Sequence, residues 1–365
     1  MTVNVGVDLH KTQFTVCAPV GKKEGFAKYQ TNESGYETFL KQVKSWQKKG
    51  NEVRVGVEST GNTRYFKSRM EAAGTEVVVI NTLKFKVVNE SVKKTDKHDA
   101  ATIAEFLAKD MLPESKLCSE ASEQLRRLLK VRTTLVRTSV TVKNQIHALL
   151  TGMGMEDKKA SLQSKRGRQR ELDTLKEREN GLVVQPLFET IERLAENVKK
   201  IEEEIEKLVE GDRMVELLMT IPGCGKISAW TIRAFTDDIN RFSSAKKYAA
   251  YAGLVPWVQN SNESIRHGKI TKRGPEELRT ALVQVVMGLR RCKKTTVTWR
   301  LMKRYEVMKQ AKGSGKSIIA TARKLSTIIW TMLSRDEEFN STLMIDKRLE
   351  GKAASMRDLA VQSVG

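Results

Sequence analysis

The stretch "NVGVDLH", residues 4–10, decides the fold of the first part of this 365-residue chain. Its valines predict a buried strand, and Asp8 stands among them, where an unpaired carboxylate would be costly. The stretch "EVRVGVEST", residues 52–60, repeats the pattern and places Glu58 at the end of a second valine-rich strand. Parallel strands form sites at their carboxyl ends, so the two carboxylates can converge if these strands are neighbours. A partner or a metal ion is expected there.

The segments around these two stretches predict an α/β unit. Strands are expected at 4–10, 13–20 and 25–31, followed by a helix at 33–50, a strand at 52–60, a helix at 62–74 and a strand at 75–81. Three leading strands followed by alternating helices and strands are typical of a mixed sheet covered by helices. The pattern after this point is helical for a long distance.

Two further carboxylates, Asp96 and Asp99, occur in "KKTDKHDAA", residues 93–101. Residues three apart are neighbours on a helix surface, so these carboxylates either share a cation or form a solvated helix start near the favourable dipole. Together with Asp8 and Glu58 they would form a four-carboxylate cluster. Such a cluster suits Mg2+ or Mn2+ and the chemistry of phosphoryl transfer.

The composition indicates a polyanionic partner. Lys and Arg total 65 against 44 Asp and Glu, which gives a net charge of +21. Nucleic acid is the first candidate and an acidic membrane surface the competitor, but no apolar run approaches the ~20 residues that a spanning helix needs. The start "MTVNVGVDLHK" lacks a signal peptide, so we expect a cytoplasmic protein that associates with the nucleoid when bound to DNA. The four cysteines are scattered singly, which signals neither a disulfide framework nor a zinc site.

The middle of the chain is basic and helical. Residues 116–147, which include Arg126 and Arg127, are expected to form a helix whose basic face either lies along nucleic-acid phosphates or is simply solvated. The polar stretch 151–185 is expected to be a linker or a mobile segment. A heptad seam follows, which predicts either a coiled coil that joins protomers or a bundle within the chain. Its members are Leu187, Ile191, Leu194, Val198, Ile201, Ile205 and Leu208.

The last part begins after Gly211 and Asp212. The turn "IPGCGK", residues 221–226, resembles a helix-hairpin-helix, although a plain turn between two helices fits as well. Near residue 312, "KGSGKS" invites a nucleotide-binding interpretation, but the Walker pattern needs glycine where Gln310 stands. We therefore expect a flexible basic loop there.

Several motifs together resemble a known family. "VGVDLHK", "VGVEST" and "KTDKHDA" are similar to the Asp, Glu, Asp, Asp signature of insertion-sequence transposases with an N-terminal RuvC-like domain, which are described as bridge-RNA-guided recombinases. Residues 242–282, "FSSAKKYAAYAGLVPWVQNSNESIRHGKITKRGPEELRTAL", resemble the second conserved block of that family, its transposase domain. The motifs occur in the family's order, with a helical middle between them.

The resemblance implies an RNase H-like fold for the N-terminal domain and metal binding by Asp8, Glu58, Asp96 and Asp99. It also implies a serine nucleophile, which falls on Ser261 when counted from Gly253. The next residue is Asn262, where the family has glycine, so Ser264 and Ser244 are kept as alternatives. In the family the site forms between protomers, which implies a homo-oligomer, a dimer or a tetramer.

We therefore expect an α/β domain joined to all-α parts: a RuvC-like domain at 1–115, basic helices, linker and coiled coil at 116–210, a transposase domain at 211–345 and a tail at 346–365. The expected function is RNA-guided cutting and rejoining of donor and target double-stranded DNA through a phosphoserine, with a bridge RNA as partner. The alternatives are a metal-dependent junction resolvase that uses water and a non-catalytic RNA- or DNA-binding protein. The candidate nucleic-acid contacts are Lys93, Lys94, Lys97, Arg126, Arg127, Lys272 and Arg273.

Overall fold

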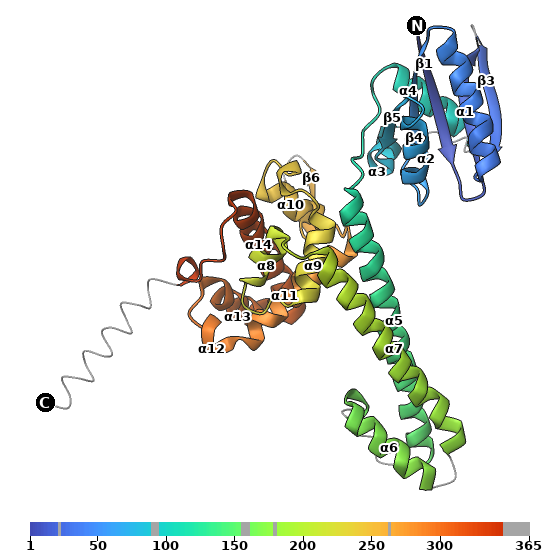
Figure 1. Ribbon diagram of the computed structural model, residues 1–365. Helices are drawn as coiled ribbons and strands as arrows, with labels where there is room; N and C mark the ends of the chain where they lie inside the picture. Colours follow the sequence, from blue (N-terminus) through green and yellow to red (C-terminus); the bar gives the residue numbers. More distant parts are fainter. Residues whose placement is uncertain (21–22, 89–94, 155–160, 178–180, 262–263, 346–365) are drawn as a thin grey trace, which may run out of the picture. The chain divides into compact units, whose positions relative to one another are not determined.

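The computed structural model describes residues 1–20, 23–88, 95–154, 161–177, 181–261 and 264–345 (Figure 1). The chain divides into two compact units, Met1–Cys118 and Ser119–Gly365. The first unit is α/β and the second is mostly helical, which confirms the fold class expected from the sequence at this level.

A five-stranded mixed sheet forms the centre of the first unit. Its strands are β1 (Thr2–Leu9), β2 (Gln13–Val20), β3 (Lys23–Gln30), β4 (Glu52–Glu58) and β5 (Glu76–Ile80). Their order is β3-β2-β1-β4-β5. β2 pairs antiparallel with β1 and with β3, whereas β1, β4 and β5 run parallel. The two valine-rich strands that carry the candidate carboxylates are therefore direct neighbours.

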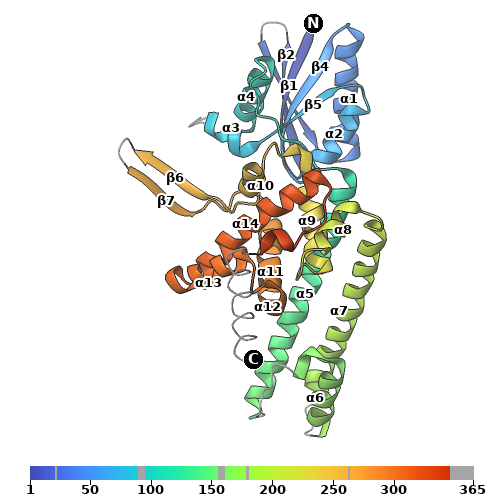
Figure 2. The same ribbon diagram turned by 90° about the vertical axis from the view of Figure 1, so that its left-hand side faces the viewer.

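Helices cover both faces of this sheet, and Figure 2 shows α1 and α2 on one side and α4 on the other. The helices are α1 (Glu33–Lys48), α2 (Thr63–Glu71), α3 (Thr82–Val88) and α4 (Asp96–Ala108). Alternation along β1 directs Val5, Val7 and Leu9 into the core beneath α1 and α2, because successive side chains of a strand point to opposite faces. Gly6 and Asp8 consequently belong to the face that α4 covers.

The second unit consists mainly of helices. They are α5 (Glu120–Gly152), α6 (Lys165–Glu177), α7 (Gly181–Leu208), α8 (Arg213–Met219), α9 (Lys226–Thr236), α10 (Ala245–Tyr251), α11 (Glu276–Arg291), α12 (Lys293–Thr296), α13 (Arg300–Lys312) and α14 (Ser314–Arg335). Short 3-10 helices occur at Ser161–Gln163, Ile239–Arg241 and Thr342–Met344. An antiparallel hairpin of β6 (Pro256–Ser261) and β7 (Ser264–Ile270) extends away from these helices (Figure 2).

The heptad seam of α7 packs against α5 of the same chain. Near one end of the helix pair, Ile191 lies in a buried cluster with Val142 and Ile146. Near the other end, Ile205 of α7 and Leu125 of α5 are both buried in the main hydrophobic core of the second unit. Of the two alternatives that the heptad pattern left open, the structure shows the bundle within the chain.

The stretch 151–185, expected to be a linker, contains α6, so this expectation is wrong. Leu175 of α6 and Leu162 of the preceding 3-10 helix are fully buried, and the Nε atom of Arg168 lies 2.7 Å from the Oε1 atom of Glu192 on α7. The polar composition conceals an amphipathic helix, because two leucines, Leu172 and Leu175, and one paired arginine hold α6 in place. The basic loop expected near residue 312 is also absent, since only Gly313, with φ of 81°, separates α13 from α14.

The main core of the second unit lies among α9, α11 and α14. Gly223, in the turn between α8 and α9, meets Gly288 of α11 so closely that a Cβ atom at Gly223 would lie 2.4 Å from the carbonyl carbon of Gly288.

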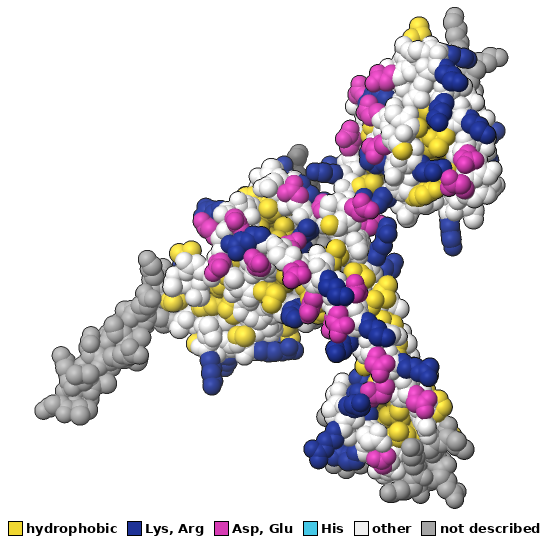
Figure 3. All heavy atoms as spheres, viewed as in Figure 1, with side chains coloured by type: hydrophobic (Ala, Val, Ile, Leu, Met, Phe, Trp, Pro, Cys, Tyr) yellow, Lys and Arg dark blue, Asp and Glu magenta, His cyan; other side chains and the backbone are white. Residues whose placement is uncertain are grey.

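On the face in Figure 3, Lys and Arg side chains are interspersed with Asp and Glu along the helices. Within the described residues, no helix combines the length and apolar character needed to cross a membrane.

Candidate active site

Asp8 and Glu58 lie at the carboxyl ends of two adjacent strands. The parallel register pairs Val7 of β1 with Val57 of β4, so the residues that follow, Asp8 and Glu58, occupy neighbouring positions. Asp8 is only 7% exposed, and Glu58 is half-buried. This edge of a parallel strand pair is where α/β proteins build their sites.

Helix α4 brings Asp96 and Asp99 to the same edge in its first turn. The helix begins after Thr95, whose side-chain oxygen accepts a hydrogen bond from the backbone N–H of His98 at 3.2 Å. Acidic residues in a first turn are favoured by the helix dipole. The sequence "TDKHDA" therefore both starts the helix and sets the two carboxylates one turn apart on one side of it.

Two glycines allow α4 to approach the sheet. Gly6 of β1 and Gly56 of β4 are partners in the parallel register. A Cβ atom at Gly6 would lie 2.0 Å from the carbonyl oxygen of Ala100, and one at Gly56 would lie 2.8 Å from a methyl group of Ile103. Each glycine comes two residues before a carboxylate. The motifs "VGVD" and "VGVE" therefore provide both the glycines on which α4 packs and the acids beside that contact.

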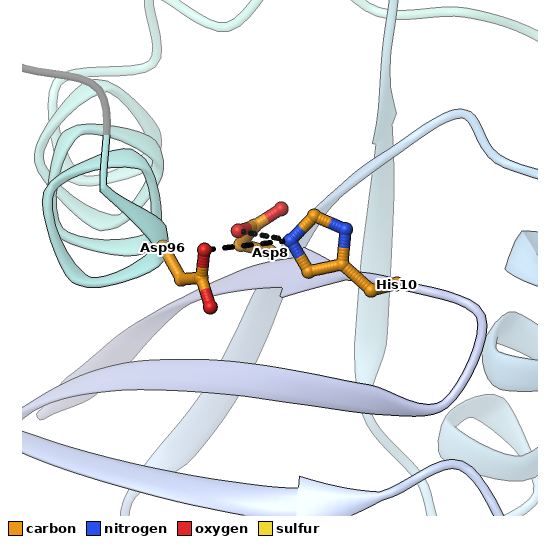
Figure 4. Close-up of side chains that lie close together, drawn as sticks. All are labelled: Asp8, His10 and Asp96. Carbon is orange, nitrogen blue, oxygen red and sulfur yellow. Dashed lines mark ion pairs between the residues drawn. The ribbon is translucent and has the colours of Figure 1, made fainter.

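His10 completes a compact group with Asp8 and Asp96 (Figure 4). Its Nε2 atom lies 3.0 Å from Oδ2 of Asp8 and 3.6 Å from Oδ1 of Asp96. Our sequence reasoning missed this residue. The signal that could have found it is the spacing in "DLH", because residues two apart at a strand end share a face.

The four predicted carboxylates are close enough to interact electrostatically. Burial raises the pKa of Asp8 above its ordinary value, and the charges of Asp96 and Asp99 add to this shift. His10 opposes it through its charge and its hydrogen bond. Burial likewise raises the pKa of Glu58, with further contributions from Asp8 and Asp99. The ionised forms of Asp8 and Glu58 are thus destabilised by burial and by neighbouring negative charge, and a bound cation would relieve this cost.

Asp96 differs from the two strand carboxylates because it has a cationic partner. Burial acts to raise its pKa, but the hydrogen bond and charge of Lys28 outweigh this effect, so the pKa lies below its ordinary value. The Nζ atom of Lys28 lies 3.4 Å from Oδ2 of Asp96, which leaves Oδ1 directed at His10.

The donor set fits a divalent cation. Within the described residues, one atom each from Asp8, His10 and Asp96 lie within 4.8 Å of one another. Glu58 and Asp99 are outside this compact group, but the charge of Asp99 raises the pKa values of Asp8 and Glu58, and the charge of Asp8 raises the pKa of Glu58. Carboxylate oxygens at a desolvated strand end are the ligands that hard divalent cations prefer.

The predicted serine lies on the β6–β7 hairpin of the second unit. Ser261 is the last residue of β6, and its register partner is Ser264, the first residue of β7. Asn262, the departure from the family pattern, lies outside the described residues. The alternative Ser244 caps α10, because its Oγ atom accepts a hydrogen bond from the backbone N–H of Lys247 at 3.3 Å.

The basic residues of the first unit and of α5 differ in their surroundings. Lys93 and Lys94 lie outside the described residues. Lys97 is exposed on α4, with its Nζ atom 5.7 Å from the ring centre of Phe26. The exposed guanidinium of Arg127 pairs with Glu123 at 2.9 Å.

Arg126, in contrast, is engaged inside the second unit. Its Nε atom donates a hydrogen bond to the carbonyl oxygen of Ala234 at 2.8 Å, and its guanidinium lies 4.7 Å from the ring centre of Phe235. These contacts join α5 to α9 and indicate a packing role for this arginine. Lys272 and Arg273, beyond the end of β7, are both exposed.

Comparison with known families gives two matches in the order of the chain. A model of the DEDD transposase domain of IS110 elements, described as "Transposase", matches residues 5–155. A second model, described as "Transposase IS116/IS110/IS902 family", matches residues 215–300. The two matches together span about two thirds of the chain and include both the carboxylate region and the hairpin.

Full-length relatives agree with these matches. A probable family 20 transposase of Pseudomonas aeruginosa is 26% identical over 91% of this chain and 97% of its own length. The transposase of insertion sequence element IS1111A from Coxiella burnetii is 26% identical over 92% of this chain and 90% of its own length. A pilin gene-inverting protein of Moraxella bovis is 25% identical over 93% of this chain and 98% of its own length.

The two units and these likenesses define a DNA transposase, an enzyme that cuts and rejoins DNA strands. The chain belongs to the IS110 family of insertion-sequence transposases, as its resemblance to that class indicated.

Proposed function

We propose that this transposase exchanges DNA strands through a covalent phosphoserine at Ser261, with Mg2+ held by Asp8, Glu58, Asp96 and Asp99. The observation that carries the proposal is the convergence of the four carboxylates, two from strand ends and two from the first turn of α4. The raised pKa values of Asp8 and Glu58 support it, because they arise from burial of the two carboxylates and from neighbouring negative charge, both of which a bound cation would offset.

The proposal includes an RNase H-like fold for the first unit. Its support is the strand order β3-β2-β1-β4-β5, with three leading antiparallel strands followed by two parallel ones. In such a sheet the central strand β1 and its parallel neighbour β4 end side by side, where Asp8 and Glu58 lie. We also propose the division into a catalytic part at 1–115, a helical part at 116–210 and a transposase part at 211–345.

The carboxylates would hold the cation, which when bound stabilises negative charge that develops on a phosphate undergoing displacement. Asp8 and Glu58 come from adjacent strands, whereas Asp96 and Asp99 come from a helix seated on glycines. Their positions therefore depend on rigid elements rather than on loops, as accurate placement of ligands requires.

The serine supplies the covalent step. In this step the Oγ atom of Ser261 forms a bond to phosphorus, the bond from phosphorus to a DNA oxygen breaks, the serine proton passes to a base, and the released DNA oxygen takes a proton. Attack by a DNA hydroxyl on the phosphoserine reverses these changes and joins new strands. The bond energy of the cut strand is conserved in the phosphoserine ester, so exchange needs no external energy source.

Two partners complete the proposal. A structured bridge RNA would select the donor and target DNA, and the net charge of +21 supports binding of polyanions. A homo-oligomer, dimer or tetramer, would act on the paired DNA ends. Among the described residues, Lys97, Lys272 and Arg273 are exposed, and we propose them as phosphate contacts.

The test uses the full-length protein with its co-purified RNA and labelled donor and target DNA. We expect the wild-type protein to form a covalent protein–DNA adduct that survives denaturation, and Ser261→Ala to form none. Ser264→Ala is the matched control, because Ser264 is the register partner of Ser261, and it is expected to retain the adduct.

Each other outcome points to a specific alternative. Strand cutting without an adduct in the wild-type protein would favour a resolvase that uses water. Undiminished exchange by Ser261→Ala would overturn the serine assignment, and exchange by Asp8→Asn would overturn the metal site. Full activity after removal of all RNA would overturn the guided part of the proposal.

A further inference from the structure

We infer that His10 is a further ligand of the metal site and that its imidazole nitrogen gives the site a preference for Mn2+ over Mg2+. The inference rests on the proposed function, because it assumes that the carboxylates hold a divalent cation. It adds a nitrogen donor to the four carboxylates of the proposed site.

The first argument is the spacing of the donor atoms. Two ligands that are adjacent in an octahedron, each ~2.1 Å from the ion, lie about 3.0 Å apart. The Nε2 atom of His10 lies 3.0 Å from Oδ2 of Asp8 and 3.6 Å from Oδ1 of Asp96. One ion can therefore contact all three residues with only small side-chain adjustments.

The second argument is how His10 is held. Its backbone N–H donates to the carbonyl oxygen of Gln13 at 2.9 Å, and its carbonyl oxygen accepts from Nδ2 of Asn62 at 3.1 Å. β2 and the start of α2 thus fix the main chain on both sides. Figure 4 shows the ring directed with Nε2 at the two carboxylates. The main chain of His10 is therefore held by two elements of the fold, and its ring contacts Asp8 and Asp96.

The third argument is the exposure of the ring. The side chain of His10 is 51% exposed, whereas that of Asp8 is 10% exposed. A histidine that served only to neutralise Asp8 would gain from burial beside it. A ring that is half exposed to solvent instead keeps one side of the donor group accessible to water or a phosphate oxygen, as a catalytic metal site requires.

The preference for Mn2+ follows from ligand chemistry. Mg2+ is bound almost entirely through oxygen atoms and water, whereas first-row transition metals also accept imidazole nitrogen. A site with one imidazole among its carboxylates therefore loses more Mn2+ affinity than Mg2+ affinity when that imidazole is removed. Loss of a group that orients or supplies a ligand typically weakens metal binding 10- to 100-fold, and we expect a change of about this size for Mn2+.

The experiment loads the full-length protein with Mn2+ and measures electron spin-echo envelope modulation. A coordinated imidazole produces a 14N coupling to the Mn2+ spin. We expect this coupling in the wild-type protein, its loss in His10→Gln and its persistence in His98→Gln. His98 is a suitable control because it is a second histidine of the same unit, on α4 between Asp96 and Asp99, and lies outside the compact group.

Affinities for Mn2+ and Mg2+, measured by calorimetry on the same proteins, provide the second readout. The ratio of Mn2+ to Mg2+ affinity is expected to fall in His10→Gln and to stay unchanged in His98→Gln. A thermal melt of each variant, together with His10→Asn as a second substitution, separates loss of the ligand from loss of the fold.

The outcomes distinguish this inference from the proposed function. A 14N coupling that persists in both His10 variants, or Mn2+ that binds to the wild-type protein without any such coupling, would overturn the role of His10 while leaving the carboxylate site intact. Mn2+ binding that is equally strong in Asp8→Asn would instead overturn the metal site itself.

Discussion

Gly6 of β1 lies beside Gly56 of β4 in the parallel register, and the backbone of α4 passes over Gly6 at a distance that admits no side chain. This relationship determines where Asp96 and Asp99 lie relative to Asp8. The glycine pair is therefore as important for the site as the acids, although neither glycine has a functional group.

Gly6→Ala is expected to destabilise the protein and to weaken metal binding. Its Cβ atom would overlap the backbone of Ala100, so α4 must move away from β1. Such overpacking typically costs about 1–3 kcal/mol, and a contact with backbone belongs at the upper end. Gly56→Ala is expected to cost less, because there the Cβ atom meets only side chains. Urea unfolding and Mn2+ titration measure both effects.

The control for these two variants is Gly61→Ala, since a Cβ atom at Gly61 would have no heavy atom of the described residues within 4 Å apart from those of its two chain neighbours. It is expected to leave stability and metal affinity almost unchanged. Equal effects of Gly6→Ala and Gly61→Ala would show that the close approach of α4 is not what positions the carboxylates.

Divalent metal is expected to stabilise the first unit through Asp8. At a free concentration 100 times the dissociation constant, Mg2+ or Mn2+ adds about 2.7 kcal/mol to the free energy of unfolding. Asp8→Asn is expected to lose this gain, whereas Glu76→Gln, which alters a surface acid paired with Arg54 in the same unit, is expected to keep it. Thermal melts with and without metal measure the difference.

Without metal, Asp8→Asn is expected to be more stable than the wild-type protein at pH 7. The folded state raises the pKa of Asp8, so the ionised carboxylate is less favourable in the folded than in the unfolded chain. This penalty is absent below about pH 3.9, the ordinary pKa of aspartate, and develops as the pH rises. A metal-free melt at pH 7 in which Asp8→Asn is the less stable protein would contradict this prediction.

Asp237 is expected to stabilise the second unit at neutral pH. Burial acts to raise its pKa, but hydrogen bonds from Ser119 and Ser122 outweigh this effect and lower it. A lowered pKa contributes stability that is present above the unfolded value of about 3.9 and is lost as the pH falls through the folded value. Asp237→Asn is therefore expected to cost about 1–3 kcal/mol at pH 7 and progressively less at acidic pH.

Asp336→Asn is the matched control for that variant. Asp336 has φ of 52°, close to the 61° of Asp237, but its carboxylate is exposed and paired with Arg213 at the surface. Both residues have positive φ, where asparagine, like aspartate, is enriched among residues other than glycine, so the substitution itself adds little backbone strain at either position. Denaturant unfolding from pH 3 to pH 7 is expected to show a pH-dependent difference for Asp237→Asn alone, and parallel curves for the two variants would refute the assignment.

Gly268→Ala is expected to displace the indole of Trp257. A Cβ atom at Gly268 would lie 2.0 Å from the Nε1 atom of Trp257, across the β6–β7 hairpin. The indole can rotate because Trp257 is 46% exposed, so we expect greater acrylamide quenching of tryptophan emission rather than unfolding. The increase is expected to vanish in a Trp257→Phe background, and an unchanged quenching curve for Gly268→Ala alone would speak against this packing.

Strong local patterns predicted much of the first unit. The valine-rich stretches that carry Asp8 and Glu58 form neighbouring parallel strands, and the predicted mixed sheet is confirmed. Patterns of this kind are reliable because a buried strand needs continuous apolar side chains whatever surrounds it. The helix α6 was missed because its few buried leucines are separated by charged residues that resemble those of a linker.

The sequence by itself indicated the class of protein, through motifs that resemble those of a known family, and the comparisons confirm that class. It also predicted the four acids as metal ligands, because such motifs depend on residue types and short spacings. Only the tertiary structure decided that the α7 seam packs on α5 of the same chain, that Arg126 packs on Phe235 and that His10 joins Asp8 and Asp96. The physical reason is that each of these contacts joins residues from different elements. The sequence pattern of one element shows which of its side chains are buried, but it does not specify which other element they pack against.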